Sequence, residues 1–319
     1  GNALPRKLFE DFASIVEKLY IVEELDPVIE EQVKSWGIKA TGKEIFTVQG
    51  EYSANMLREA ILGEELKLDA PAAAPGRPPI LCPGCPHRSV YYVLNKLKMH
   101  AAGDIGCYTL GNAMPLDMVD TCLCMGAGLN IAQGIEKVEP DTTCFAFVGD
   151  STFFASAITG VVNAVYNQAN MVLVVLDNST TAMTGHQPHP GTGRTVMGEI
   201  VQKINIEQVL RGIGVTEIET INPLELEASV SCVKRMAEKS GVRAIIFKAP
   251  CIAVTKPKAP LHVDQGSCIG CKKCIRDLGC PAIVMNDGKI CIDASMCTGC
   301  HLCSQVCPVC AIAGGDDHE

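Results

Sequence analysis

The last quarter of the chain carries two closely spaced cysteine runs, which constrain the fold more than any other feature of the sequence. Each run is a triplet followed by a Cys-Pro pair: Cys268-x2-Cys271-x2-Cys274-x5-Cys280-Pro281 and Cys297-x2-Cys300-x2-Cys303-x3-Cys307-Pro308. A triplet on a tight loop can supply three thiolates to one cubane iron–sulfur cluster, and the fourth ligand then comes from the other run. The spacing therefore predicts a compact tail that holds two 4Fe–4S clusters a short electron-transfer distance apart.

The predicted ligand sets each combine one triplet with the Cys-Pro cysteine of the other run: Cys268, Cys271, Cys274 and Cys307, and Cys297, Cys300, Cys303 and Cys280. The first run has five residues before its Cys-Pro, where the bacterial ferredoxin pattern has three, but the ligand set is complete. Two alternatives are structural zinc on paired CxxC groups and a disulfide framework. The interleaved pattern favours iron–sulfur clusters over both.

Composition narrows the class of protein. The 319 residues give room for two or three domains. A net charge of −9 without a basic stripe argues against nucleic-acid binding, and no apolar run reaches the roughly 18 residues of a membrane span. Because 18 cysteines occur without a recognisable signal peptide, we expect reduced thiols and a cytoplasmic protein of an anaerobe.

The pattern of elements predicts three domains joined by two connectors. Residues 1–68 are expected to form a small α/β module, with a strand over 18–26 and a helix over 27–37. The Ala/Pro/Gly-rich segment 69–79 is the clearest boundary. A second domain over 80–253 and a connector over 254–264 then lead to the cysteine-rich tail, 265–315, which we expect to be a ferredoxin-like α+β domain.

The central domain reads as a βαβ unit. Two apolar strands, 144–150 and 171–177, flank a helical pattern over 153–169. A later helix over 223–241 and a strand over 242–250 continue the alternation. The pattern is typical of an α/β fold with a doubly wound parallel sheet.

Polar residues follow both central strands. Asp150 ends the first strand and Asn178 follows the second. Because the carboxyl ends of parallel strands face the same crevice, these side chains are expected to meet there and could hold Mg²⁺ and a phosphate. The alternative is that Asp150 only caps a helix and Asn178 only begins a turn.

The spacing of these residues resembles the thiamine diphosphate signature, GDG followed after about 26 residues by Asn, although Ser151 replaces the last glycine. Further segments resemble the alpha subunits of the 2-oxoacid:ferredoxin oxidoreductase family, in its indolepyruvate class. These segments are LDNSTTAMTGHQPHPGTG (176–193), LCPGCPHRSVYYVL (81–94), GDIGCYTLG (103–111) and DTCLCMGAGLNIAQG (120–134). With the tail, the resemblance covers about residues 18–312.

The resemblance implies a cofactor site. Asp150 and Asn178 would give side chains to Mg²⁺, and Thr180 its backbone carbonyl. The residues expected beside thiamine diphosphate are Gly149 and Ser151 at the diphosphate, and Gly126, Ala127 and Gly128 at the start of the next helix. It also implies a third 4Fe–4S cluster, on Cys82, Cys85, Cys107 and Cys251. The alternative is that these four are small core residues, as we expect for Cys122, Cys124, Cys144 and Cys232.

Three histidines, His87, His186 and His189, lie in family-like motifs. His186 and His189 are candidates for handling protons or the substrate carboxylate. Single histidines are more often structural.

The implied reaction is oxidative decarboxylation of an aryl-2-oxoacid, such as indolepyruvate, to an acyl-CoA, with CoA as co-substrate and external ferredoxin as electron acceptor. A beta subunit is the expected partner. The pyrimidine-binding half would lie in an absent N-terminal region or a separate chain, so this chain alone is expected to be a poor catalyst. The alternatives are a non-redox thiamine diphosphate decarboxylase or ligase, and an electron-transfer subunit without catalytic activity, which Ser151 favours.

Overall fold

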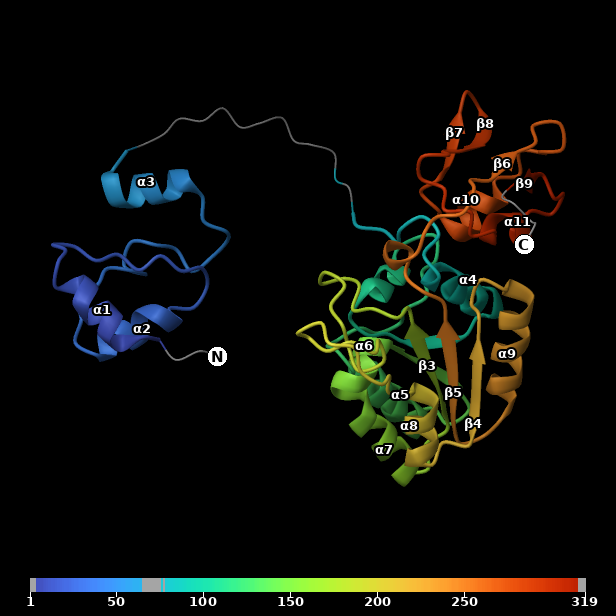
Figure 1. Cartoon of the computed structure of the whole chain (residues 1–319), viewed down its shortest axis with the longest axis horizontal. Coiled ribbons are helices and arrows are strands. Elements are labelled where there is room, and N and C mark those ends of the chain that lie inside the picture. The colour runs from blue at the N-terminus through green and yellow to red at the C-terminus, as the bar shows by residue number, and fades with distance from the viewer. Residues whose placement is uncertain (1–3, 65–75, 77, 315–319) are drawn as a thin grey trace. The chain divides into compact units, whose positions relative to one another are not determined.

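The computed structural model describes residues 4–64, 76 and 78–314 (Figure 1). The chain divides into two compact units, 1–76 and 77–319. The division falls within the predicted connector 69–79, most of which lies outside the described residues, as do the ends of the predicted 1–68 module and residue 315. The further division of the second unit into 80–253 and 265–315 stays a prediction.

The described part of the first unit is helical. Its helices are α1 (Arg6–Ala13), α2 (Val28–Ser35) and α3 (Ala54–Leu62). The helix predicted over 27–37 is confirmed as α2. The strand predicted over 18–26 is wrong, because only Tyr20 pairs there, in an isolated bridge with Thr41.

The reason lies at the start of α2. The carboxylate of Glu23 accepts hydrogen bonds from the first backbone N–H groups of that helix, at Ile29 (2.9 Å) and Glu30 (2.8 Å). Leu25 takes a positive φ of 58°. The segment therefore turns to cap α2 instead of extending.

The second unit is built on a parallel five-stranded sheet in the order β1-β2-β3-β5-β4. The strands are β1 (His100–Ala102), β2 (Cys144–Gly149), β3 (Met171–Asp177), β4 (Glu217–Ile221) and β5 (Val242–Lys248). The predicted strands 144–150, 171–177 and 242–250 are confirmed as β2, β3 and β5. In register, Gly149 lies opposite Leu176, and Leu176 opposite Phe247, so the three strands end at one edge.

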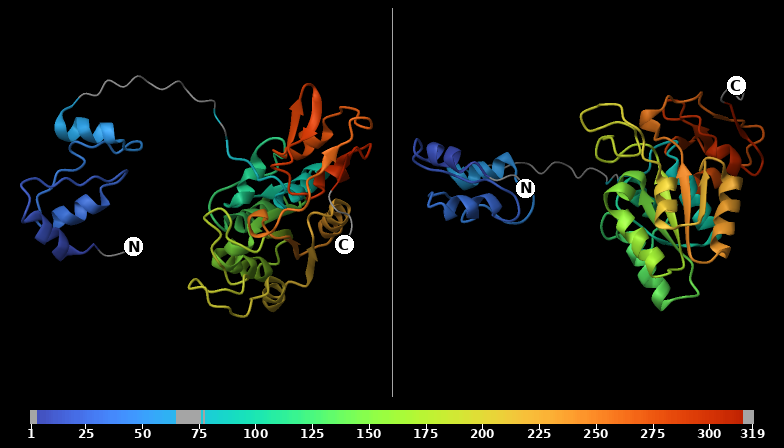
Figure 2. Two further views of the ribbon diagram at one scale, coloured as in Figure 1. Left: turned by 45° about the horizontal axis from the view of Figure 1, so that its top comes forward. Right: turned by 60° about the horizontal axis from the view of Figure 1, so that its bottom comes forward.

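Helices cover both faces of this sheet (Figures 1 and 2). On β2, Phe145 and Phe147 pack into a core with α4 (His87–Leu97) and α9 (Leu226–Glu238). Ala146 and Val148 pack into a second core with α5 (Ala127–Val138), α7 (Ile158–Tyr166) and α8 (Ile206–Ile213). The alternation along each strand thus buries both faces. Helix α9 confirms the helix predicted over 223–241.

The helix predicted over 153–169 is interrupted. Asp150–Thr152 form the short helix α6, Phe153–Ala157 form a π-helix, and only then does α7 begin. Such π-helical turns are often found at functional sites. This turn follows Asp150 directly, at the carboxyl edge of the sheet.

The tail packs against α4. Its elements are β6 (His262–Val263), α10 (Lys273–Leu278), β7 (Ile283–Asn286), β8 (Lys289–Ile292), α11 (Leu302–Val306) and β9 (Ile312–Ala313). Leu278 and Leu302 share the core that contains Tyr91 and Leu94 of α4. Strand β6, in the segment predicted as a connector, pairs with β9. Within the described ranges, no helix is both long enough and apolar enough to span a bilayer.

Candidate functional site

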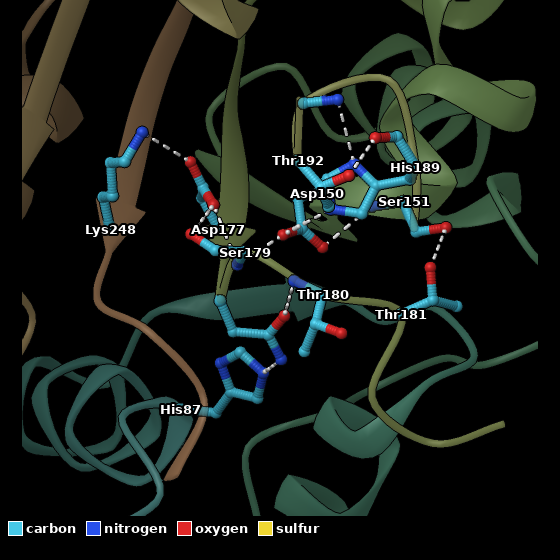
Figure 3. Close-up of polar contacts among 12 residues, drawn as sticks. His87, Asp150, Ser151, Asp177, Ser179, Thr180, Thr181, His189, Thr192 and Lys248 are labelled. Carbon is cyan, nitrogen blue, oxygen red and sulfur yellow. Dashed lines mark hydrogen bonds and ion pairs between the residues drawn. The ribbon is translucent and has the colours of Figure 1, made fainter. Parts of the chain in front are cut away.

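A cavity of about 100 Å³ opens at the carboxyl edge of the sheet. Its lining includes residues that follow β2 and β3 and residues from the start of α4 and the segment after β1: His87, Tyr108, Asp150, Ser151, Asn178 and Thr180. The structure therefore brings Asp150, Asn178 and Thr180 together, as the parallel arrangement of their strands predicted. Figure 3 shows most of this site.

Asp150 is a buried carboxylate at the end of β2, with 3% of its surface exposed. Its Oδ1 accepts a hydrogen bond from Ser151 N (2.8 Å), and its Oδ2 accepts one from Ser179 N (2.7 Å). Burial raises the pKa of this carboxyl above its ordinary value, against the opposing effect of His189. The site thus buries a carboxylate, and the loss of its hydration disfavours the charged form.

A second carboxylate, Asp177, lies at the end of β3. Its Oδ1 accepts from the same Ser179 N (3.1 Å), and its Oδ2 lies 3.1 Å from Lys248 Nζ (Figure 3). The negative charge of Asp177 further raises the pKa of Asp150. Lys248 therefore balances Asp177, while Asp150 has no lysine or arginine partner among the described residues.

Asn178 lies between the two strands and the start of α4. Its Oδ1 accepts a long hydrogen bond from Thr180 N (3.3 Å), and its Nδ2 lies 3.3 Å from His87 Nε2. Burial lowers the pKa of His87 to about 4, so this imidazole is neutral at pH 7 and can accept from the amide. His87 thereby orients Asn178.

The two histidines of the 176–193 segment differ in position. His189 is buried and stacks on Phe154, and its Nε2 lies 3.1 Å from Asp150 Oδ2 without meeting hydrogen-bond geometry. His186 is exposed, takes a positive φ of 63° and does not line the cavity. The structure thus places only His189 beside Asp150.

Of the five residues predicted to contact thiamine diphosphate, two line the cavity and three do not. Gly149 and Ser151 line the cavity, and Ser151 Oγ accepts a hydrogen bond from Thr181 Oγ1 (2.9 Å). Gly126, Ala127 and Gly128 do not line it. A Cβ at Gly128 would lie 2.3 Å from the backbone oxygen of Gly103, so this glycine allows α5 to approach the chain after β1. The cofactor contact of these three residues stays a prediction.

Sequence reasoning missed Asp104 and Tyr108. Asp104 is fully buried, and its Oδ1 accepts from Gly126 N at the start of α5 (2.7 Å). Tyr108 donates its hydroxyl to Asp104 Oδ2 (3.1 Å), and its ring meets His87 edge-on. The available signal was a charged residue at a strand's carboxyl end, since Asp104 follows β1 as Asp150 follows β2.

The donor set around Asp150 fits Mg²⁺. This ion prefers carboxylate, amide and carbonyl oxygens, and Asp150, Asn178 and Thr180 supply one of each at a single edge of the sheet. A buried carboxylate beside a second carboxylate is costly unless a cation compensates it. A divalent cation with a phosphate in its shell would supply that compensation.

The thiols predicted to hold a third cluster are neighbours. Burial raises the pKa of Cys85 to about 12, and the charges of Cys82 and Cys107 add to that shift. Burial also raises the pKa of Cys107, to which Cys251 and Cys82 contribute. Cys107 lines the cavity, and Cys251 N donates to Asn178 O (2.9 Å). Cys107 and Cys251 therefore lie beside the Asp150 site, and Cys82 and Cys85 lie near Cys107.

In the tail, thiols of the two runs also mix. Burial raises the pKa of Cys303 to about 12, with added effects from Cys300, Cys280 and Cys297. Cys280 belongs to the first run and the other three to the second, which is the predicted combination.

In the other predicted tail set, a cysteine of the second run again lies near cysteines of the first run. Burial raises the pKa of Cys274, and its neighbours Cys271 and Cys307 add to the shift. Cys268 is half-buried and packs against the core that the tail shares with α4. Backbone N–H groups point at two of the tail sulfurs, from Leu261 to Cys297 Sγ (3.5 Å) and from Ala311 to Cys307 Sγ (3.3 Å).

Thiol sets of this kind fit cubane clusters, whose cysteine sulfurs commonly accept such bonds. In the part of the chain that the structure describes, no three His, Cys, Asp or Glu side chains converge closely enough to bind one metal ion.

Comparison with known proteins places these residues in a family context. Residues 104–247 match the C-terminal TPP binding domain of thiamine pyrophosphate enzymes. The chain is 39% identical over 335 residues to indolepyruvate oxidoreductase subunit IorA of Methanothermobacter thermautotrophicus, covering 97% of this chain and 54% of that protein. It is 38% identical over 340 residues to IorA of Archaeoglobus fulgidus, covering 98% and 54%. The chain thus spans about half the length of the curated relatives it matches.

Among solved structures, a 2-oxoglutarate:ferredoxin oxidoreductase from Magnetococcus marinus is 20% identical, with a TM-score of 0.48, over 56% of this chain and 67% of that one. A score of this size supports no conclusion about function.

Proposed function

We propose that this chain, which is similar over nearly its whole length to about half of the indolepyruvate oxidoreductase IorA subunits, carries the diphosphate site and the electron-transfer centres of a thiamine-dependent 2-oxoacid oxidoreductase. The observation that carries the proposal is the position of Asp150. This carboxylate is buried at the end of β2, beside Asn178 and the start of α6, and it has no lysine or arginine partner among the described residues.

The residues at the carboxyl edge would hold Mg²⁺ and the cofactor diphosphate. Asp150 and Asn178 contribute side-chain oxygens and Thr180 its backbone carbonyl, while Gly149 and Ser151 let the backbone approach the diphosphate. Ser179 N and His87 hold Asp150 and Asn178 in place, since each contacts one of these two side chains. Thiamine diphosphate, when bound, supplies the carbanion chemistry that decarboxylates a 2-oxoacid.

The cysteine sets would hold three 4Fe–4S clusters. One set is Cys82, Cys85, Cys107 and Cys251, next to the diphosphate site. The others are Cys297, Cys300, Cys303 and Cys280, and Cys268, Cys271, Cys274 and Cys307. Each such centre takes up one electron at a time, and iron–sulfur potentials extend down to about −700 mV. The packing of the tail on α4 supports electron transfer from the diphosphate site to the tail.

Similarity to the IorA subunits supports a proposal for the substrate and the partners. We propose an aryl-2-oxoacid of the indolepyruvate class, CoA as the acyl acceptor and external ferredoxin as the electron acceptor. A beta subunit and a pyrimidine-binding half would complete the enzyme.

Calorimetric titration of the chain with thiamine diphosphate and Mg²⁺ tests the central site. We expect binding that requires Mg²⁺ and that Asp150→Ala abolishes. Equal binding by the variant would overturn the assignment, and no binding by either protein would favour an electron-transfer subunit.

A second experiment, on the assembled enzyme, tests whether the clusters accept electrons from the substrate. The 2-oxoacid should bleach the visible absorption of the clusters before CoA is added. A non-redox decarboxylase or ligase would leave that absorption unchanged.

A further inference from the structure

Arg88 is a buried arginine that connects the loop of Cys82 and Cys85 to the tail. Only 3% of its surface is exposed. Its Nη2 donates to the backbone oxygens of Leu81 (2.6 Å) and Cys82 (3.3 Å). Its Nη1 donates to those of Leu278 (2.6 Å) and Gly279 (2.9 Å). One guanidinium therefore holds two chain segments that lie about 190 residues apart in the sequence.

The charge of Arg88 has no carboxylate partner among the described residues, and its buried Nε has no hydrogen-bond partner. The ionisable groups that act on it are thiols: Cys280, Cys85, Cys300 and Cys82. Two of them belong to the set beside the diphosphate site, and two to a tail set. Burying a cation is energetically costly unless anions compensate it, so we expect negatively charged groups on both sides of Arg88.

The same two sets also touch through their loops. Gly84 lies between Cys82 and Cys85, and Thr298 lies between Cys297 and Cys300. A Cβ at Gly84 would lie 1.8 Å from Thr298 Oγ1, so the loops are in direct contact. Arg88 and the Gly84–Thr298 contact identify, independently, which tail set adjoins the diphosphate side.

We propose that Arg88 is a positioning residue between two iron–sulfur clusters, those of Cys82, Cys85, Cys107 and Cys251 and of Cys280, Cys297, Cys300 and Cys303, and that its charge raises the reduction potentials of both. This inference rests on the proposed function, because it requires clusters at those sets. Each one-electron reduction adds one negative charge to a cluster, and a buried cation nearby stabilises that charge. The guanidinium fork fixes the spacing of the two loops through its four carbonyl contacts.

The test uses the full chain, purified without oxygen and titrated with dithionite, with each cluster followed by its electron paramagnetic resonance signal. Arg88→Gln removes the charge. We expect the reduced-to-oxidised ratio of the two adjoining clusters to fall about tenfold at a fixed ambient potential, which is about 59 mV for a one-electron couple. The cluster of Cys268, Cys271, Cys274 and Cys307 should shift less.

Arg243 offers a matched control. It is a fully buried arginine near the start of β5, at the opposite end of that strand from the cavity, and it donates to the backbone oxygens of Met236 (3.0 Å) and Gly241 (2.7 Å). Among the described residues, its hydrogen-bond partners are the oxygens of Met236, Asn170 and Gly241, and none is a thiol. Arg243→Gln should destabilise the fold and leave all cluster potentials unchanged.

Arg88→Lys separates charge from geometry. It keeps the cation and loses the fork, so it should retain potentials near those of the native protein. Unchanged potentials in Arg88→Gln, or equal shifts in Arg88→Lys and Arg88→Gln, would overturn the proposal. If Arg88→Gln loses its clusters, Arg88→Lys decides alone: native-like potentials support the role of charge, and shifted potentials contradict it.

Iron analysis of the same samples distinguishes this inference from the proposed function. About twelve irons with unchanged potentials in Arg88→Gln would overturn this inference alone, whereas about eight irons in the native chain would contradict a cluster on the Cys82 set, and with it both the inference and that part of the proposed function.

Discussion

Gly84 and Thr298, in two loops more than 200 residues apart, are packed so closely that no side chain fits at position 84. Gly84 takes a φ of +70°, and a Cβ there would lie 1.8 Å from Thr298 Oγ1. We expect Gly84→Ala to cost about 1–2 kcal/mol in backbone strain and about 1–3 kcal/mol more in overpacking. Urea unfolding, followed by circular dichroism, measures the loss.

Gly288 is the control for the strain alone. It lies in the turn between β7 and β8 at a φ of +76°, and a Cβ there would meet nothing within 4 Å. Gly288→Ala should therefore cost only the strain. An equal loss of unfolding free energy in the two variants would show that the contact with Thr298 is not tight.

Charge at Asp150 should control cofactor binding. Asp150→Asn keeps the shape of the side chain and removes the anion, so the Kd for thiamine diphosphate with Mg²⁺ should rise by more than about 100-fold. Asp177→Asn should have an intermediate effect of about 10–100-fold, because Asp177 acts through the shared Ser179 N–H, as supporting groups around metal ligands do. Calorimetry measures both, and an Asp177 effect larger than that of Asp150 would reverse the assignment.

The cysteines outside the tail should fall into two classes. Cys107→Ala should remove about four irons per chain, because a cubane without one of its thiolates is poorly held. Cys122→Ala should remove none, although Cys122 lies within 3.6 Å of the oxygen of Asp104, close to the same cavity. Iron analysis of protein purified without oxygen measures both, and equal iron in the two variants would contradict a cluster at Cys107.

A pH effect is expected in the first unit. The hydrogen bond from Lys34, followed by that from Gly42 N (2.8 Å), lowers the pKa of Glu44 to about 2. A carboxyl with a lowered folded-state pKa stabilises the fold above its unfolded value of about 4.5, and this contribution is lost as the pH falls toward 2.

Carbon-13 nuclear magnetic resonance of the Glu44 carboxyl should give a midpoint near that lower value. Lys34→Met should move the midpoint up. A midpoint near the ordinary value in the native chain would show that Lys34 and Gly42 do not hold Glu44.

Local patterns predicted strands β2, β3 and β5 and the position of Asp150 and Asn178 at one edge of the sheet, but not strands β1 and β4. Strands β2 and β3 are continuous apolar runs, and the carboxyl ends of parallel strands lie at the same edge, so the spacing of the two residues was sufficient. The break of the 153–169 helix was not predictable, because the π-helical turn leaves its apolar periodicity nearly intact. The strand over 18–26 failed because Glu23 is used to cap α2.

Contacts over long sequence distances escaped prediction. Nothing near Arg88 in the sequence indicates that its guanidinium reaches Leu278 and Gly279, since those partners are set by how the tail packs on α4. His186 and His189 look alike in the sequence, yet only His189 turns inward, where it stacks on Phe154.

The most direct test of the account is the content of iron and zinc per chain in protein purified without oxygen. We predict about twelve irons and no zinc, which corresponds to three cubane clusters. About eight irons would confine the clusters to the tail and contradict the centre beside Asp150. Zinc in place of iron would contradict electron transfer by this chain altogether.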